Sequence, residues 1–221
     1  MSLVIYGDPH GEWRPLLAAL AEVAPAAVVI LSDCEQARPI RVELARVYAA
    51  GVEVAYVYGS HGKDSAGVWD NLAGDHTAGL LHARVARLRP FAVAGTAGVF
   101  KQRIWLPPAT AMFETRAAFV RQFAHHERWR GSVPLKQRDG IFPEDFLALA
   151  DARTDILVTH EAPSSHRHGF TALDDLARGL GVRLVVHGHH HGSCAGVTGD
   201  GIRVIGLAKA EVLLFREGDL P

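Results

Sequence analysis

The sequence has little cysteine, no excess charge of either sign and no long hydrophobic run. Two cysteines, Cys34 and Cys194, among 221 residues cannot build a disulfide scaffold and are typical of a reducing compartment. With 23 Lys+Arg against 24 Asp+Glu, the net charge of -1 gives no bulk-charge argument for binding nucleic acid or a membrane. No apolar run reaches the ~20 residues of a membrane span, and residues 1–11 do not resemble a secretory signal. We therefore expect a soluble, cytoplasmic protein.

The chain does contain enough apolar residues for a core, at 48% of the total. Short apolar runs that end in polar loops alternate with segments of helical spacing, which predicts an α/β fold with several parallel, covered strands. Strands are expected at residues 3–6, 27–31, 52–58, 91–100, 155–159 and 183–186, and helices at 13–23, 42–50 and 171–180. We expect a single domain over residues 1–221 that ends in a hairpin over 202–215.

The middle of the chain breaks this alternation. Residues 64–88 have weakly punctuated helical spacing, and residues 110–129 predict a long helix whose basic face carries Arg116, Arg121 and Arg128. We expect a helical insertion at about residues 105–140, placed over one edge of the sheet.

Aspartate and histidine residues follow the predicted strands, at the point where each strand ends. Because the carboxyl ends of parallel strands open onto one crevice, these side chains are expected to meet there. A site built from imidazole and carboxylate ligands suits Mn, Fe, Zn or Ni. It differs from a structural zinc site, which is rich in cysteine. The residues at these positions are Asp8, His10, Asp33, Ser60, His61, His160 and the run His187-Gly188-His189-His190-His191.

The order and spacing of these residues resemble those of the calcineurin-like metallophosphoesterases. The shared motifs run along nearly the whole chain and read Asp8-x-His10, Asp33, Gly59-Ser60-His61, His160 and Gly188-His189-x-His191. The resemblance implies two packed mixed β-sheets flanked by helices, a four-layer metallophosphoesterase-like sandwich. It also implies a metal-dependent hydrolase of phosphate esters.

The same resemblance implies a binuclear centre of two divalent or trivalent transition-metal ions. One ion would be held by Asp8, His10 and His191, and Asp33 would bridge the two. His160 and His189 would hold the second ion, with help from Ser60. In that centre the ions would supply a hydroxide for attack on phosphorus, and His61 matches the family's histidine that would protonate the leaving oxygen. Asp33 and His61 are thus the expected catalytic residues.

Two departures from the family pattern have consequences. Ser60 stands where the family usually has a metal-binding asparagine, and a serine hydroxyl is shorter and a weaker donor of electrons. We therefore expect a weaker second metal site, or one completed by water. Residues Gln36-Ala37-Arg38 follow the second motif in place of Asp-Arg-Gly, which counts against a Ser/Thr protein phosphatase.

Four further histidines lie near these motifs in the sequence. His166 and His168 are candidates for contact with the substrate phosphate, although a solvated loop is the interpretation that their sequence context favours. His187 and His190 lie between predicted ligands, and the alternation of an extended segment turns them away from the metals.

The leading hypothesis is a binuclear phosphomonoesterase or phosphodiesterase that acts on a phosphorylated small molecule or nucleotide. The alternative is a catalytically weak or inactive phosphoesterase-like scaffold that binds a protein partner. A nuclease of the same family is a third hypothesis, which the near-neutral charge does not favour. The sequence predicts no membrane partner and no particular oligomeric state.

Overall fold

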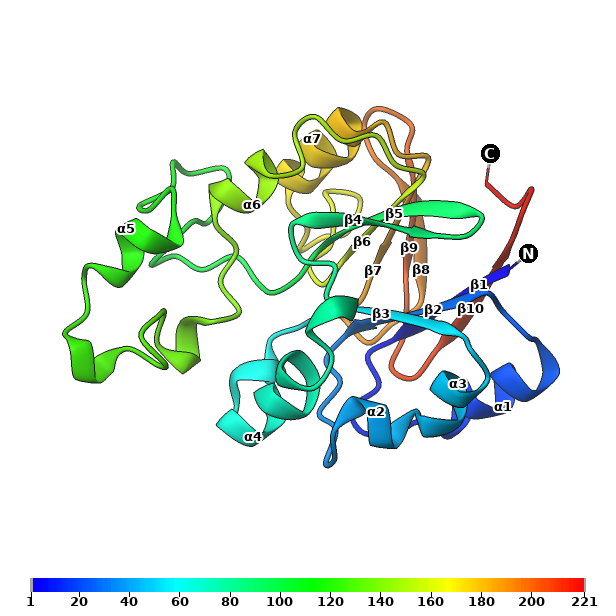
Figure 1. The fold of residues 1–221 in the computed structure, drawn as a ribbon. Coiled ribbons are helices and arrows are strands. Elements are labelled where there is room, and N and C mark those ends of the chain that lie inside the picture. The colour runs from blue at the N-terminus through cyan, green and yellow to red at the C-terminus, as the bar shows by residue number, and fades with distance from the viewer. Residues whose placement is uncertain (1, 221) are drawn as a thin grey trace.

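The computed structural model describes residues 2–220, and its first sheet has four strands (Figure 1). The strand order is β10-β1-β2-β3, in which β1, β2 and β3 are parallel and β10 is antiparallel to β1. Continuous apolar runs form the three parallel strands because their side chains are covered on both faces of the sheet. The bounds are β1 Ser2–Gly7, β2 Ala27–Ser32, β3 Glu53–Tyr58 and β10 Val212–Arg216.

The second sheet has six strands in the order β4-β5-β6-β7-β9-β8. Its four central strands are parallel, and the edge strands β4 and β8 are antiparallel to their neighbours. The bounds are β4 Arg84–Leu88, β5 Phe91–Thr96, β6 Ile156–Thr159, β7 Leu184–His187, β8 Cys194–Val197 and β9 Arg203–Gly206.

Helices cover the outer face of each sheet, and the inner faces share one core. Figure 1 shows α1 (Arg14–Glu22), α2 (Ile40–Glu43) and α3 (Ala45–Ala49) against the first sheet, with α6 (Pro143–Leu147) and α7 (Thr171–Leu180) beside the second. Buried residues of both sheets, such as Ile30 and Val186, belong to the same apolar cluster. The predicted fold class, two mixed sheets flanked by helices, is confirmed.

The prediction of helix over residues 64–88 is only partly correct. A short α4 (Ala66–Trp69), a π-helical turn (Asp70–Gly74) and a 3₁₀ turn (Thr77–Gly79) form there, but residues 84–88 are strand β4. This strand pairs only with β5 and lies at the edge of its sheet. Edge strands tolerate exposed charged residues such as Arg84 and Arg87, which hide the apolar pattern of a strand.

The long helix expected over residues 110–129 is wrong, since only α5 (Arg116–Val120) and a 3₁₀ turn (His125–Glu127) form there. Phe119 instead packs in a small core with Ile104, Val133 and Phe142, and this tertiary packing outweighs helix propensity. The predicted basic face is absent, because Arg116 pairs with the buried Asp145. One domain with an insertion over residues 105–140 stays a prediction.

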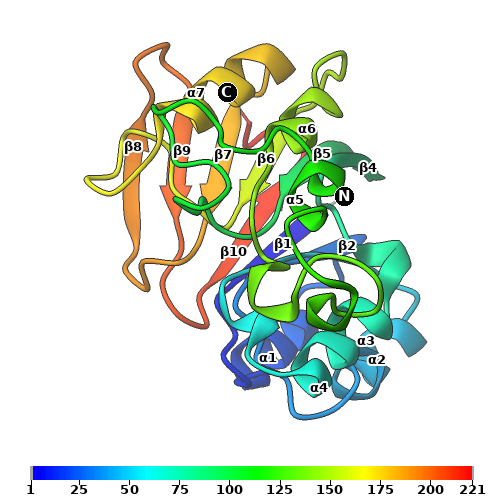
Figure 2. The same cartoon turned by 90° about the vertical axis from the view of Figure 1, so that its left-hand side faces the viewer.

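The hairpin expected over residues 202–215 is also wrong. Strand β9 pairs with β7 and β8 in the second sheet, whereas β10 crosses to the first sheet and pairs with β1. The last segment of the chain therefore joins the two sheets (Figure 2). Within residues 2–220, no helix has the length and apolar character needed to cross a membrane.

Candidate metal centre

Within residues 2–220, side chains near the ends of several strands gather into three groups that could hold a metal ion, and two of them contain the predicted ligands, while the third consists of Glu35, His61 and Asp64. Asp8, His10 and His191 form one group, and each can place a ligand atom within 4.8 Å of the others. The second group meets the same limit and consists of Asp33, His160 and His189. The structure thus brings together the predicted aspartate and histidine ligands, although the chain carries them as far apart as residues 8 and 191.

The first group presents two imidazole nitrogens to each other. His10 Nε2 and His191 Nε2 are 2.9 Å apart, and their rings are perpendicular. On the far side of the His10 ring, Nδ1 lies 3.1 Å from Glu35 Oε2. A carboxylate at Nδ1 keeps the proton there and leaves the Nε2 lone pair for a metal, which is the usual second contact of a metal-binding histidine.

The carboxylates of Asp8 and Asp33 are both buried. Asp8 Oδ2 accepts a hydrogen bond from the backbone N–H of His189 at 3.0 Å. Burial, and next the negative charge of Asp33, nevertheless raise the pKa of Asp8 to about 7. A cation held between these carboxylates would remove both penalties, because it offsets their repulsion and replaces lost hydration.

His160 in the second group has the features of a neutral metal ligand. Its ring is fully buried, and Nδ1 contacts the hydroxyl of Ser32. The Nε2 atom is shielded from solvent, has no hydrogen-bond partner and lies 3.8 Å from Asp33 Oδ2. Burial, and then the neighbouring histidines, lower the pKa of His160 well below its usual value, so the ring stays neutral. These donors fit a pair of transition-metal ions.

The backbone around the centre is strained. Left-handed φ angles are rare for residues with a side chain, and they persist at functional sites where the surrounding structure enforces them. Of the nine such non-glycine residues within residues 2–220, six belong to the loops of the centre. They are Asp8 (38°), His10 (43°), Ser32 (84°), Glu35 (45°), His189 (74°) and His191 (54°).

Two glycines leave room for the ligand side chains. A Cβ on Gly59 would lie 2.2 Å from Asp33 Oδ1 and 2.6 Å from His160 Cε1. A Cβ on Gly188 would lie 2.4 Å from Asp8 Oδ2. All three distances are well inside van der Waals contact, so the buried carboxylates can occupy these positions only beside glycine.

Ser60 and His61 both contact the predicted bridging residue, Asp33. The hydroxyl of Ser60 donates to Asp33 Oδ2 at 3.3 Å, and the backbone N–H of His61 donates to Asp33 Oδ1 at 2.8 Å. Ser60 thus lies beside the second ligand group while its hydroxyl is directed to a carboxylate. Its role as a metal ligand stays a prediction.

Glu35 is a site residue that the sequence analysis missed. Its two carboxylate oxygens lie 3.1 Å from His10 Nδ1 and 2.8 Å from His61 Nδ1, so it joins a predicted ligand to the predicted proton donor. Asp64 also approaches His61 Nδ1, at 2.8 Å. Burial lowers the pKa of His61, but Asp64, Asp33 and Glu35 together outweigh that effect and raise it. The sequence feature that could have indicated the role of Glu35 is its position two residues after the predicted ligand Asp33.

The predicted substrate residues His166 and His168 do not join either ligand group. They lie with His187 and His190 in a separate cluster of imidazoles, in which the rings of His166 and His190 are stacked. His187 is buried at the end of β7, and its Nε2 is 3.8 Å from Cys194 Sγ. Direct contact of His166 and His168 with substrate remains a prediction.

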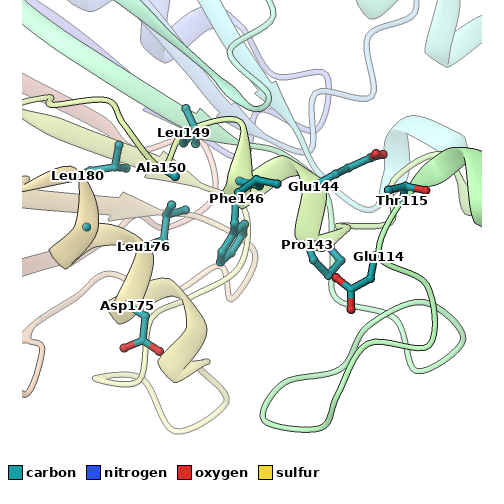
Figure 3. A pocket seen from close by; sticks show the side chains of 12 residues that line it. Glu114, Thr115, Pro143, Glu144, Phe146, Leu149, Ala150, Asp175, Leu176 and Leu180 are labelled. Carbon is teal, nitrogen blue, oxygen red and sulfur yellow. The ribbon is translucent and has the colours of Figure 1, made fainter.

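A groove of about 550 Å³ lies elsewhere, between α6 and α7 (Figure 3). Apolar side chains such as Phe146 and Leu176 line it, together with the acidic residues Glu114, Glu144 and Asp175. It holds no histidine and none of the predicted site residues. The metal chemistry therefore belongs to the strand ends, and not to this groove.

Known proteins share both this fold and its sequence pattern. A family model for calcineurin-like phosphoesterases matches residues 1–193. An uncharacterized protein of Haemophilus influenzae is 33% identical over 190 residues, which cover 86% of this chain and 83% of that protein. The structure of TT1561 from Thermus thermophilus has a TM-score of 0.58 at 16% identity, with 95% of this chain and 89% of that one covered. A dimetal phosphatase from Danio rerio has a TM-score of 0.53 at 13% identity, covering 95% and 88%.

The family match, the fold and the two candidate ligand groups together support a metal-dependent phosphoesterase. The chain belongs to the calcineurin-like phosphoesterase family. Membership implies a dinuclear metal centre, for which the two ligand groups are the candidates.

Replacing Gly59 by alanine is expected to empty at least one metal site, because the new methyl group overlaps Asp33 and His160. Elemental analysis of protein equilibrated with manganese should fall from about two ions per chain to about one or fewer. Gly179→Ala is the control, since nothing lies within 4 Å of its added Cβ. Full metal content in Gly59→Ala would contradict the assignment.

Replacing Ser60 by asparagine is expected to tighten the second metal site by about tenfold, because a carbonyl oxygen is a better ligand than a hydroxyl that donates to Asp33. Calorimetric titration with manganese resolves the weaker binding step. Ser60→Ala serves as the control for loss of the hydroxyl and should change that step little. An unchanged or weaker second step in Ser60→Asn would count against the placement of Ser60 at this site.

Proposed function

We propose that this protein hydrolyses phosphate monoesters or diesters at a binuclear metal centre built from Asp8, His10, Asp33, His160, His189 and His191, with Ser60 beside it. The observation that carries the proposal is the pair of ligand groups, joined by two buried carboxylates and adjoining His61. When bound, two ions supply an activated water and positive charge for the oxygens of the phosphate.

The residues around the centre support a proton donor for the leaving alcohol. Glu35 and Asp64 both face Nδ1 of His61 and favour its protonated form, so Nε2 carries a proton that it can donate. Asp33 accepts a hydrogen bond from the backbone N–H of His61. This bond keeps the imidazole ring of His61 next to the ligand groups. His61 protonates the leaving oxygen, and Glu35 and Asp64 orient it.

The substrate class follows from the family and the electrostatics. The substrate is a phosphorylated small molecule or nucleotide, and a similar fold is found in the dimetal phosphatase of Danio rerio. The balance of charge supports neither nucleic acid nor an anionic membrane as a partner. The ligand set suits Mn, Fe, Zn or Ni. Free Cys34 and Cys194 agree with a cytoplasmic location.

The test begins with metal content and hydrolysis on the same sample. Tag-free protein, purified without chelator and re-equilibrated with manganese, should hold about two ions per chain. It should then cleave a chromogenic phosphomonoester or phosphodiester, and a chelator should abolish the activity. One ion or none, with no hydrolysis, would favour the alternative of a scaffold that binds a protein partner.

Asp33→Asn is expected to lower kcat by at least about a hundredfold, because a neutral amide cannot hold two cations as a carboxylate does. Metal content should fall in parallel. Asp151→Asn, which changes an exposed aspartate, is the matched control and should leave both quantities unchanged. Turnover near that of the wild type with full metal content would show that Asp33 does not bridge the ions.

Glu35→Gln is expected to lower kcat by about 10- to 100-fold, because it removes the negative charge that orients both His10 and His61. Metal affinity should weaken as well, since His10 is a predicted ligand. Glu12→Gln is the matched control in the neighbouring loop, where Glu12 pairs with Arg14. Wild-type kcat and metal affinity in Glu35→Gln would exclude a positioning role.

A further inference from the structure

Four histidines outside the ligand groups form a second cluster, which we call the imidazole cluster: His166, His168, His187 and His190. The rings of His166 and His190 stack with centroids 3.9 Å apart and an interplanar angle of 21°. The ring of His168 lies 5.9 Å from that of His190. His190 also lies 4.9 Å from His189, centroid to centroid, so the cluster directly adjoins the second ligand group.

The loop that carries His166 and His168 is held in one conformation. Ser164 at its start donates its backbone N–H and its hydroxyl to Asp174 of α7. Inside the loop, His166 N–H donates to Pro163 O at 3.0 Å and Gly169 N–H donates to His166 O at 2.8 Å. Figure 2 shows this segment, in yellow, beside β8. The two histidines are therefore presented by a preorganised turn.

The geometry does not favour a third metal ion in the imidazole cluster. In a face-to-face stack, the ring nitrogens of His166 and His190 lie in two nearly parallel planes. They therefore do not point toward a common position at which a metal ion could bind. Within the described residues, these histidines belong to none of the groups able to hold a metal. His166 Nδ1 accepts the backbone N–H of His168 at 3.3 Å, so the proton of the neutral ring lies on Nε2.

The cluster instead offers hydrogen-bond donors to an anion. His166 Nε2–H is one donor, and the ring of His190 stacks on the His166 ring and holds it in place. Arg167, exposed on the same loop, adds a permanent positive charge. Burial lowers the pKa of His166, and the neighbouring His168 and Arg167 lower it further. A bound anion would offset the lowering that these two neighbours cause.

We propose that the imidazole cluster binds a second, uncleaved phosphate group of the substrate. The substrate is then an ester that carries two phosphate groups, one at the metal centre and one at His166, His168 and His190. This inference rests on the proposed function, because it takes the metal centre as the place of the cleaved phosphate. The contact between His189 and His190 sets the two phosphates on adjoining sites.

The test compares ligands that differ only in the second anionic group. Alkyl monophosphonates and the matching terminal bisphosphonates, with two to four methylene groups, are titrated calorimetrically into the manganese-loaded protein. For at least one spacer length, the bisphosphonate should bind at least about tenfold more tightly, since hydrogen bonds to a charged group are stronger than those between neutral groups. Equal affinities at every length would overturn the proposal.

Variants test whether the imidazole cluster causes the tighter binding of the bisphosphonate. The double variant His166→Ala, His168→Ala should reduce the preference for bisphosphonate to about threefold or less. The double variant His125→Ala, His126→Ala removes two exposed histidines elsewhere and should retain the preference. A preference that survives in the first variant would overturn the proposal.

Binding and turnover separate this inference from the proposed function. If the loaded protein binds both ligand types but cleaves no ester, the proposed function fails while the affinity ratio still tests the subsite. If it cleaves esters without any preference for two phosphates, only the subsite fails.

Discussion

The burial of two carboxylates side by side is the constraint on which the rest of this structure depends. Asp8 and Asp33 follow adjacent parallel strands and are both removed from water, which raises the pKa of Asp8. Backbone N–H groups of His189 and His61 point at these carboxylates and offset part of the cost. Bound cations would offset the remainder, so we expect metal binding and folding stability to be coupled.

Strand order explains why so much of the centre was predictable from the sequence. Parallel strands place their carboxyl ends at one edge, so Asp8 and Asp33 had to approach each other once β1 and β2 were recognised. His160 follows β6 of the second sheet, and the packing of the two sheets on one core brings it to them. The apolar runs that identify those strands are buried on both faces and are hard to mistake. The fold class followed from the same runs together with the resemblance to a known family.

The parts that were not predictable depend on contacts between distant segments or on unusual backbone conformations. Glu35 reaches His10 and His61 from a left-handed φ of 45°, which no propensity rule assigns to glutamate. The long helix expected around Phe119 gave way to aromatic packing with residues distant in the sequence, such as Phe142. The stack of His166 on His190 joins two loops, and spacing within either loop does not reveal it.

The segment after β7 shows how one strained stretch of backbone serves two sites. His189 and His191 both have left-handed φ angles, and both face the ligand groups. His190 between them is turned the other way, onto the ring of His166. Gly188 lets this segment approach Asp8 closely enough for the His189 N–H to reach the carboxylate. The strain that brings the candidate metal ligands together therefore also builds the imidazole cluster, so the two proposed phosphate sites depend on one local conformation.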